Sequence, residues 1–323
     1  MGAFNMSFIS NDYINSIERG YGDSDKKLCH ECIGNKSLKE YIKANGYVCT
    51  CDYCGQRRKA VNLDSFMVII MSGVNFLYTH AVNELPCDSG EYIGKTYTTA
   101  QLIFEELRDE IDAQDERILK DIVEIMYDDI WCDADPFSDR EEDVAYYDWQ
   151  SFCKMVKEKV RYVFYRATPD TSFNENPTTI LDTLAYYAER VRLDRRIDKN
   201  TKMYRCRTHE NDEWRTAYAD FAPPPPWVAT SGRMNAAGIN VLYLTLDPNT
   251  ALCETRTSGR DYATIASFRV TESIRVLDLT KIKKMSIPSI FDEDNRHNRS
   301  PVMFLKKFAE NISQPRSNKN IDI

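Results

Sequence analysis

Apolar residues recur at intervals of three and four through the first two thirds of the chain, which is the spacing of one face of an α-helix. Asp64 stands at a cap position before the apolar run 65–85, and the pair Thr98-Thr99 can cap 100–111. The other segments with this periodicity are 117–130, 146–165 and 178–193. Four or five successive helices with polar connections predict an all-helical unit over 61–195.

The pattern changes after Arg196. Short apolar or alternating runs are now separated by proline, glycine and asparagine, which is typical of β-strands. These runs are 201–208, 241–247, 263–271 and 274–280. Four consecutive prolines, 223–226, predict an extended loop, and 301–312 is a last helix candidate. The last third therefore predicts a mixed α/β unit.

Composition and charge narrow the class of protein. With 323 residues, the chain is long enough for two or three domains, and 42% apolar residues suffice for their cores. No run of about 18 apolar residues predicts a membrane span. The start of the chain lacks the basic and apolar regions of a signal peptide, so we expect a cytoplasmic protein. A net charge of −8 argues against nonspecific nucleic-acid binding.

The ten cysteines include two Cys-x-x-Cys pairs, Cys29/Cys32 and Cys51/Cys54, separated by 18 residues. This spacing is typical of a four-cysteine zinc site, and four thiolates would fill a tetrahedral shell. The sequence therefore predicts a structural zinc ribbon without an open catalytic position. A ribbon of this kind either nucleates the folding of a small segment or binds nucleic acid or protein. We expect the adjacent Cys49 and His30 to be bystanders.

The paired cysteines followed by helices that carry DWQSFCKMVKEKVRYVF (148–164) resemble a bacterial family with HEPN/RES N-terminal domains. The resemblance implies a HEPN helical bundle, a fold that often cleaves RNA. Its nuclease versions carry an arginine followed about five residues later by a histidine. His80 is the sole histidine of 61–195, and no arginine stands at that distance. We therefore expect a regulatory, dimerising or inhibitory role for this unit, with a homo-oligomer as one form.

A second resemblance rests on four stretches of the last third: Tyr204-Arg205, the run 231–235 (SGRMN) with Gly238, the run 242–244 (LYL), and the run 251–254 (ALCE). They look like the RES domain, which resembles ADP-ribosyltransferases and NAD-degrading toxins. The resemblance implies cleavage of the nicotinamide glycosidic bond by hydrolysis or phosphorolysis. It also implies a toxin, toxin-antitoxin or phage-defence setting with an antitoxin or immunity protein as partner.

The residues of this segment suit that chemistry. Arg205 and Arg233 can hold phosphate oxygens, because a guanidinium offers a planar fork of donors. Glu254 can stabilise an oxocarbenium-like ribose as cationic nicotinamide departs. Tyr243 can stack on a ring or bond a ribose hydroxyl. Asn235 is a weaker candidate for substrate binding, because asparagine also forms turns.

The sequence thus predicts an α+β protein with three parts: a lead-in and zinc ribbon over 1–60, an all-α HEPN-like unit over 61–195, and a mixed α/β RES domain of ADP-ribosyltransferase-like type over 196–323. The serine of the RES name usually follows a further strand and helix, so we expect the domain to be short at its C-terminal end. The alternative to an NAD-consuming enzyme is a catalytically inactive nucleotide-binding or protein-interaction module. Binding of nucleic acid through the ribbon is a third, less favoured reading.

Overall fold

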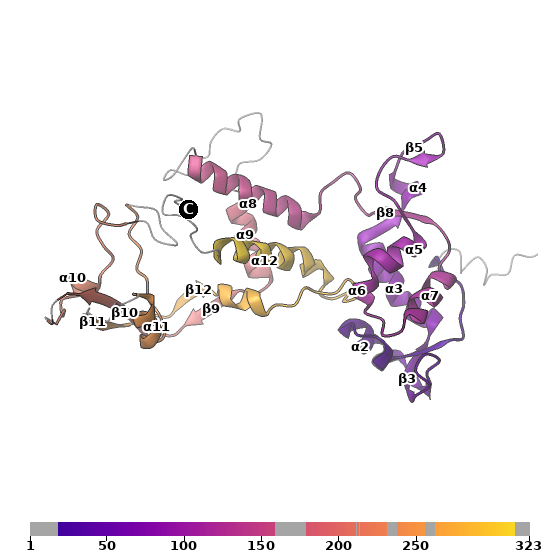
Figure 1. Ribbon diagram of the computed structural model, residues 1–323, viewed down its shortest axis with the longest axis horizontal. Helices are drawn as coiled ribbons and strands as arrows, with labels where there is room; N and C mark the ends of the chain where they lie inside the picture. Colours follow the sequence, from indigo (N-terminus) through magenta and orange to yellow (C-terminus); the bar gives the residue numbers. More distant parts are fainter. Residues whose placement is uncertain are drawn as a thin grey trace, which may run out of the picture. The chain divides into compact units, whose positions relative to one another are not determined.

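A computed structural model describes residues 19–158, 179–210, 212, 214–230, 238–255 and 262–313. The chain divides into two compact units. The first consists of Met1–Asp143 with Ser286–Met303, and the second of Val144–Met285 with Phe304–Ile323. Both units combine helices and sheets, as expected for a mixed α/β protein (Figure 1). Within the described residues, no helix is long and apolar enough to cross a membrane.

The cysteine segment of the first unit forms a three-stranded antiparallel sheet in the order β1-β3-β2. Its strands are β1 (Lys27–Cys29), β3 (Arg57–Asn62) and β2 (Tyr47–Thr50). The short helix η1 (His30–Cys32) and helix α2 (Lys36–Asn45) connect β1 with β2. Asn35 caps α2 by accepting a bond from the backbone nitrogen of Leu38.

Helix α3 (Leu63–Leu77) follows β3 directly and provides the centre of the first core. It begins one residue before Asp64, which therefore lies in the first turn while Asn62 occupies the cap position. The core that α3 shares with the cysteine segment includes Leu28 and Cys51. The two parts predicted as ribbon and helical unit thus pack around common apolar side chains.

The segment expected to be all helical also contains strands, which corrects that prediction. Strands β4 (Tyr78–His80), β8 (Ile130–Asp133) and β7 (Tyr97–Thr98) form a second sheet in the order β4-β8-β7. The predicted helix 65–85 ends at Leu77, because Tyr78–His80 pairs with β8. Helical periodicity in a short apolar run does not exclude strand pairing with a distant segment.

Several short elements complete the first unit around these sheets (Figure 1). The hairpin β5 (Cys87–Asp88) and β6 (Glu91–Tyr92) follows helix α4 (Ala81–Glu84). Thr98 caps helix α5 (Thr99–Gln101) in a reciprocal bond pair with Gln101, as its sequence predicts. The remaining elements are the π-helical turn η2 (Leu102–Glu106), α6 (Arg108–Ile111), α7 (Glu116–Ile125) and η4 (Arg296–Asn298).

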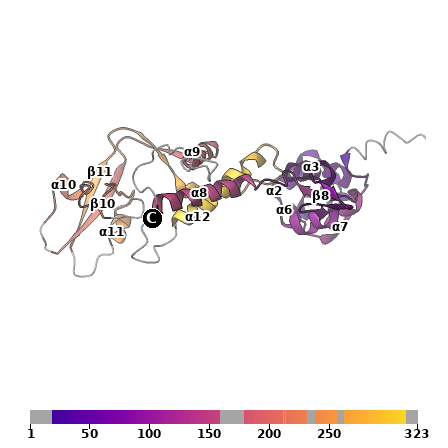
Figure 2. The same cartoon turned by 90° about the horizontal axis from the view of Figure 1, so that it is seen from above.

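Three helices build the core of the second unit: α8 (Glu141–Glu158), α9 (Thr179–Arg190) and α12 (Arg299–Ser313). They lie side by side in both views (Figures 1 and 2). Trp149 of α8 packs edge-on against Phe308 of α12, with ring centroids 4.8 Å apart. Tyr187 of α9 contacts Phe304 of α12 in the same way. Parts of the predicted helices 146–165 and 178–193 lie outside the described residues.

Two pairs of antiparallel strands complete the second unit. Strand β9 (Asp194–Ile197) pairs with β12 (Ile274–Leu277), and β10 (Lys202–His209) pairs with β11 (Tyr262–Arg269). The predicted strands 201–208, 263–271 and 274–280 are thus confirmed in β10, β11 and β12. The predicted strand 241–247 forms a single bridge, between Thr245 and Tyr204. The other elements are α10 (Tyr218–Phe221), α11 (Pro248–Glu254) and η3 (Leu279–Lys284).

Candidate functional site

The four cysteines of the two Cys-x-x-Cys pairs converge on one point. The Sγ atom of Cys29 lies 3.6 Å from Sγ of Cys32 and 3.6 Å from Sγ of Cys54. Sγ of Cys32 lies 3.7 Å from Sγ of Cys51, and the four sulfurs are all within 4.8 Å of one another. A tetrahedral ion with metal–sulfur bonds of about 2.3 Å needs sulfurs about 3.8 Å apart. This cluster can therefore hold a metal ion.

Strand ends and tight turns position these thiols. Cys29 ends β1, and Cys51 follows β2. Gly55 turns the second pair with a φ of +71°, and its backbone nitrogen donates to the carbonyl oxygen of Cys51 over 2.9 Å. The backbone nitrogen of Cys29 points at Sγ of Cys51 over 3.4 Å. Cys29, Cys32 and Cys51 are buried, whereas Cys54 is exposed.

Burial and neighbouring thiols act on the acidity of the cluster. Burial raises the pKa of the Cys29 and Cys32 thiols. Burial also acts to raise the pKa of the Cys54 thiol. The hydrogen bonds from the backbone of Gln56 and from the other thiols have a larger effect in the opposite direction, so the pKa of Cys54 is lowered to about 7. The cluster therefore contains one thiol that ionises readily near neutral pH, at its exposed side.

The two neighbours expected to be bystanders lie outside the cluster. Nδ1 of His30 is 3.1 Å from the carbonyl oxygen of Lys59, and Nε2 is 3.4 Å from Oε1 of Glu31. Both ring nitrogens of His30 thus have other partners. Cys49 is half-buried on β2 and is not one of the four clustered residues.

Asp121 anchors the ribbon to helix α7, a role that the sequence pattern did not reveal. Its carboxylate accepts a bond from the Tyr53 hydroxyl over 2.8 Å and from Nζ of Lys26 over 2.6 Å. Arg117 adds a bond from Nη2 to the carbonyl oxygen of Tyr53 over 2.8 Å. Tyr53 stands inside the second Cys-x-x-Cys pair, so these bonds connect the cysteine cluster to the helical part.

His80 lies against the carboxylate of Asp129 in the first unit. Its Nδ1 lies 2.6 Å from Oδ2 of Asp129, and its ring stacks on Trp131 with centroids 4.2 Å apart. Buried Thr99 fixes the same segment, because its hydroxyl accepts bonds from the backbone of Asp129 and from Nε1 of Trp131, both over 3.1 Å. His80, Asp129 and Trp131 line part of a cavity of about 520 Å³, together with Tyr127.

In the second unit, Arg205 stands in the middle of β10. Its Nη1 donates to the carbonyl oxygens of Phe221 over 2.9 Å and Ala222 over 3.2 Å, at the end of α10. Burial and the positive charge of Arg207 lower the pKa of Arg205. The half-buried guanidinium is thus held against the start of the four-proline stretch.

Glu254 is exposed at the end of α11. Asp247 caps this helix by accepting from the backbone nitrogen of Thr250 over 2.7 Å, and Pro248 begins it. The next residue after Glu254, Thr255, contacts Sγ of Cys206 through its hydroxyl over 3.8 Å. The end of α11 therefore lies against the middle of β10.

The segment that carries Tyr243 pairs with β10 at Thr245. Tyr204 and Thr245 exchange two backbone bonds, of 2.8 and 2.9 Å. This pairing is a single bridge, and Tyr243, which is 43% exposed, lies two residues before it. The chain segments that carry Tyr243 and Glu254 thus both contact β10, the first at Tyr204 and the second at Cys206.

The structure places Arg205 on the opposite face of the β10–β11 pair from the α11 contact. Side chains alternate along a strand, so Arg205 and Cys206 point to opposite faces. Thr255 contacts Cys206, whereas Arg205 reaches α10. Figures 1 and 2 show α10 and α11 at the two sides of the strand pair. The predicted site residues Arg233 and Asn235 lie outside the described residues.

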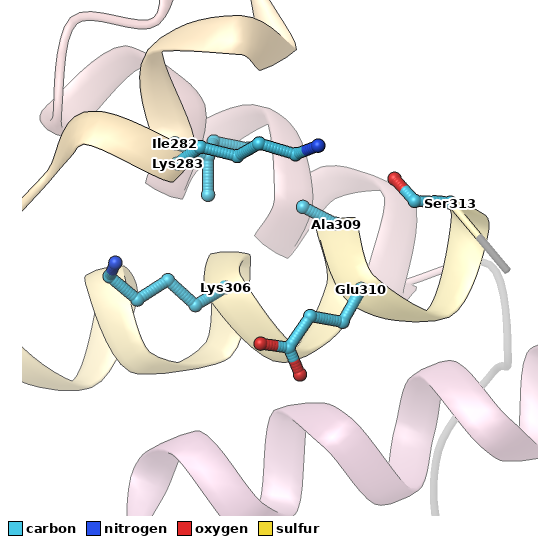
Figure 3. A pocket seen from close by; sticks show the side chains of 6 residues that line it. All are labelled: Ile282, Lys283, Lys306, Ala309, Glu310 and Ser313. Atoms are coloured by element: carbon cyan, nitrogen blue, oxygen red, sulfur yellow. The ribbon is translucent and has the colours of Figure 1, made fainter.

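A cavity of about 530 Å³ lies elsewhere in the second unit, between η3 and α12 (Figure 3). Lys283, Lys306 and Glu310 line it together with apolar groups and Ser313. None of the described residues predicted for catalysis contributes to its wall. The cavity therefore gives no support to any of the assigned roles.

Comparison with protein families gives two matches. Residues 44–170 match the family described as HEPN/RES N-terminal domain 1, and residues 202–310 match the RES domain family. No curated protein and no solved structure matches the chain. Cys51 and Cys54 lie inside the first match, and Arg205, Tyr243 and Glu254 inside the second. The chain is therefore a RES domain protein with an N-terminal HEPN/RES region.

Proposed function

We propose that this protein cleaves NAD at the bond between nicotinamide and ribose, as a toxin or phage-defence enzyme. The observation that carries the proposal is the RES match over residues 202–310, because RES domains are associated with NAD-related toxin systems. The match includes Arg205, Arg233, Tyr243 and Glu254, the residues whose chemistry suits a charged dinucleotide. An antitoxin or immunity protein would then neutralise the activity.

The reaction needs little acid catalysis, because nicotinamide leaves as a neutral molecule from its cationic form. Breaking the glycosidic bond leaves positive charge on the ribose, which the Glu254 carboxylate would stabilise. Water then attacks the ribose carbon and releases a proton to solvent, or a phosphate anion attacks it and forms the 1-phosphate. Tyr243 would position the ribose or the nicotinamide ring. The exposure of both side chains and the contacts of their segments with β10, at Tyr204 and at Cys206, support this division of roles.

Arginine side chains would bind the diphosphate group of NAD. Arg205 and Arg233 are the candidates, because guanidinium groups make charge-assisted, often bidentate bonds to phosphate oxygens. Arg205 lies on the opposite face of β10 from the α11 contact. A dinucleotide that reaches both Arg205 and Glu254 must therefore pass an edge of β10. Tyr243 belongs to the segment that bridges to that edge at Thr245.

For the cysteine cluster we propose a structural zinc ion. Four thiolate ligands suit zinc, and the observed sulfur separations of 3.6 and 3.7 Å fit a tetrahedral shell. A shell filled by four cysteines leaves no position for substrate or water. The ion would stabilise the fold of the β1-β3-β2 sheet and take no part in NAD cleavage.

Purified protein incubated with NAD should release nicotinamide, and Glu254→Gln should lower the turnover number by about 100- to 1,000-fold, the loss typical of removing one electrostatic stabiliser. Nicotinamide and the ribose-containing product are measured by chromatography. Parallel reactions with and without phosphate distinguish ADP-ribose from its 1-phosphate, and so identify the acceptor.

Glu272→Gln is the matched control, because Glu272 is another exposed acid of the same unit, in the turn between β11 and β12. Its turnover should equal that of the unchanged protein. Equal turnover in Glu254→Gln would remove Glu254 from the mechanism. Binding of NAD by calorimetry without any turnover would instead indicate an inactive nucleotide-binding module.

A further inference from the structure

Strand β10 carries a row of basic and titratable side chains on one face. Arg205, Arg207 and His209 occupy alternate positions, so their side chains point to the same side of the β10–β11 pair. The contacts of His209 agree with this register. Its Nε2 is 2.9 Å from the hydroxyl oxygen of Thr264, and its ring lies parallel to that of Tyr262, which is directly opposite on β11.

The first member of the row is held in place by backbone carbonyls. Arg205 uses Nη1 for its bonds to Phe221 and Ala222, and the rest of its guanidinium adds positive charge to the half-buried face. Burial and the charge of Arg207 both lower the pKa of Arg205, because both disfavour its cation. No carboxylate is among the causes of this shift.

Arg207 follows on the same face and is also half-buried. Across the part of the chain that the structure describes, no hydrogen bond or ion pair of Arg207 is found. Two neighbouring guanidinium groups without an anion repel each other, and a half-buried charge without a partner is unfavourable. Positions two apart on a strand are separated by about 6.8 Å, which lets two long side chains converge on one ligand.

We propose that Arg207 binds the diphosphate group of the dinucleotide substrate, next to Arg205, on the face of β10–β11 opposite α11. This inference rests on the proposed NAD cleavage and names a binding residue that the sequence pattern did not single out. Arg205 then has two tasks: it holds the end of α10 and contributes charge. Arg207 supplies its own donors, in addition to those of Arg205 that are not committed to carbonyl oxygens.

Binding and turnover of Arg207→Gln and Arg207→Lys test this proposal. Calorimetry in a phosphate-free buffer measures the affinity for NAD and for inorganic pyrophosphate, a probe that contains the diphosphate alone. Arg207→Gln should weaken both by about tenfold or more, since charge-assisted bonds to phosphate are lost. Arg207→Lys should recover part of the affinity, because it keeps the charge without the planar fork.

Nicotinamide riboside separates binding from a general structural effect. It contains the same glycosidic bond but no diphosphate, so its kcat/KM should be the same in Arg207→Gln and the unchanged protein, while KM for NAD rises. Arg269→Gln is the matched control, because Arg269 stands at an exposed end of β11 on the opposite face. Its affinities for NAD and pyrophosphate should not change.

The outcomes separate this inference from the proposed reaction. Unchanged NAD and pyrophosphate affinity in Arg207→Gln would overturn the diphosphate site, even if the protein cleaves NAD. An equal loss of kcat/KM for nicotinamide riboside would also overturn it, because that loss would mark a structural role. Pyrophosphate binding that depends on Arg207, in a protein that releases no nicotinamide, would leave the anion site standing and refute the reaction.

Discussion

Replacing Cys32 by serine should abolish stoichiometric metal binding and open the β1-β3-β2 sheet to amide hydrogen exchange. Cys32 is buried in the shared core, 6% exposed, and its sulfur has two sulfur neighbours at 3.6 and 3.7 Å. Structural zinc contributes about 10–16 kcal/mol of binding free energy in small zinc domains, and much of it is folding free energy. Native mass spectrometry measures the metal, and hydrogen exchange followed by peptide mapping measures the opening.

Cys49→Ser provides the control for this experiment. Cys49 lies on β2, two residues before Cys51, but outside the four clustered cysteines. It should keep one metal ion per chain and the exchange pattern of the unchanged protein. Removing the metal by a chelator should reproduce the Cys32→Ser pattern. A Cys32→Ser protein with full metal content and unchanged exchange would refute the four-thiolate site.

Replacing Phe291 by alanine should destabilise the first unit by about 3–5 kcal/mol, the usual cost of removing a buried phenyl ring. Phe291 is 2% exposed and belongs to the same core as α3, although it stands more than two hundred residues after that helix. Around it, Arg299 bonds to both carboxylate oxygens of Glu110, and Nη1 of Arg296 donates to the carbonyl oxygen of Ser72. Denaturant unfolding followed by hydrogen exchange in α3 measures the change.

Ile287→Ala is the matched control, because Ile287 lies in the same segment but is 42% exposed. It should change the stability by less than about 1 kcal/mol. Gly73→Ala makes the test sharper. A Cβ at Gly73 would collide with Cδ1 of Phe291, so Gly73→Ala should destabilise a protein that keeps Phe291. In the Phe291→Ala background the cavity should accept the methyl group and much of that cost should disappear.

Additive effects of Gly73→Ala and Phe291→Ala would contradict the contact between them. A change below about 1 kcal/mol for Phe291→Ala alone would contradict the burial of the ring. The burial of Phe291 in the core of the first unit has a consequence for the RES match. The match covers 202–310, yet Ser286–Met303 folds with the first unit. Removal of the N-terminal part would therefore expose Ile290 and Phe291.

Local spacing was enough to predict most of the long helices, the strands β10, β11 and β12, and the cysteine cluster. Two residues between the cysteines of each pair force a tight turn, so Cys29, Cys32, Cys51 and Cys54 could be grouped before any fold was known. The alternation of 201–208 and 263–271 identified β10 and β11 for a similar reason, since the pleat of a strand acts on neighbouring residues.

Long-range pairing could not be predicted in this way. Tyr78–His80 forms a strand because Ile130–Asp133 lies beside it, and its own periodicity is helical. The two carbonyl partners of Arg205 come from α10, and the face that this side chain occupies depends on the register between β10 and β11. The sequence identified Arg205 as a residue type that suits phosphate, but it could not show which of its donors are used.

The amino-acid sequence by itself determined the grouping of the four cysteine thiols, the helices α3, α7, α8, α9 and α12, the strands β10, β11 and β12, and the kinship with RES domains. The tertiary structure decided how these parts combine. It joined the ribbon to α7 through Asp121, placed Phe291 in the core of α3, and put Arg207 beside Arg205 on the face of β10 opposite α11. The physical reason is that turns, caps and periodicity act within a few residues, whereas burial and charge pairing depend on side chains that only folding brings together.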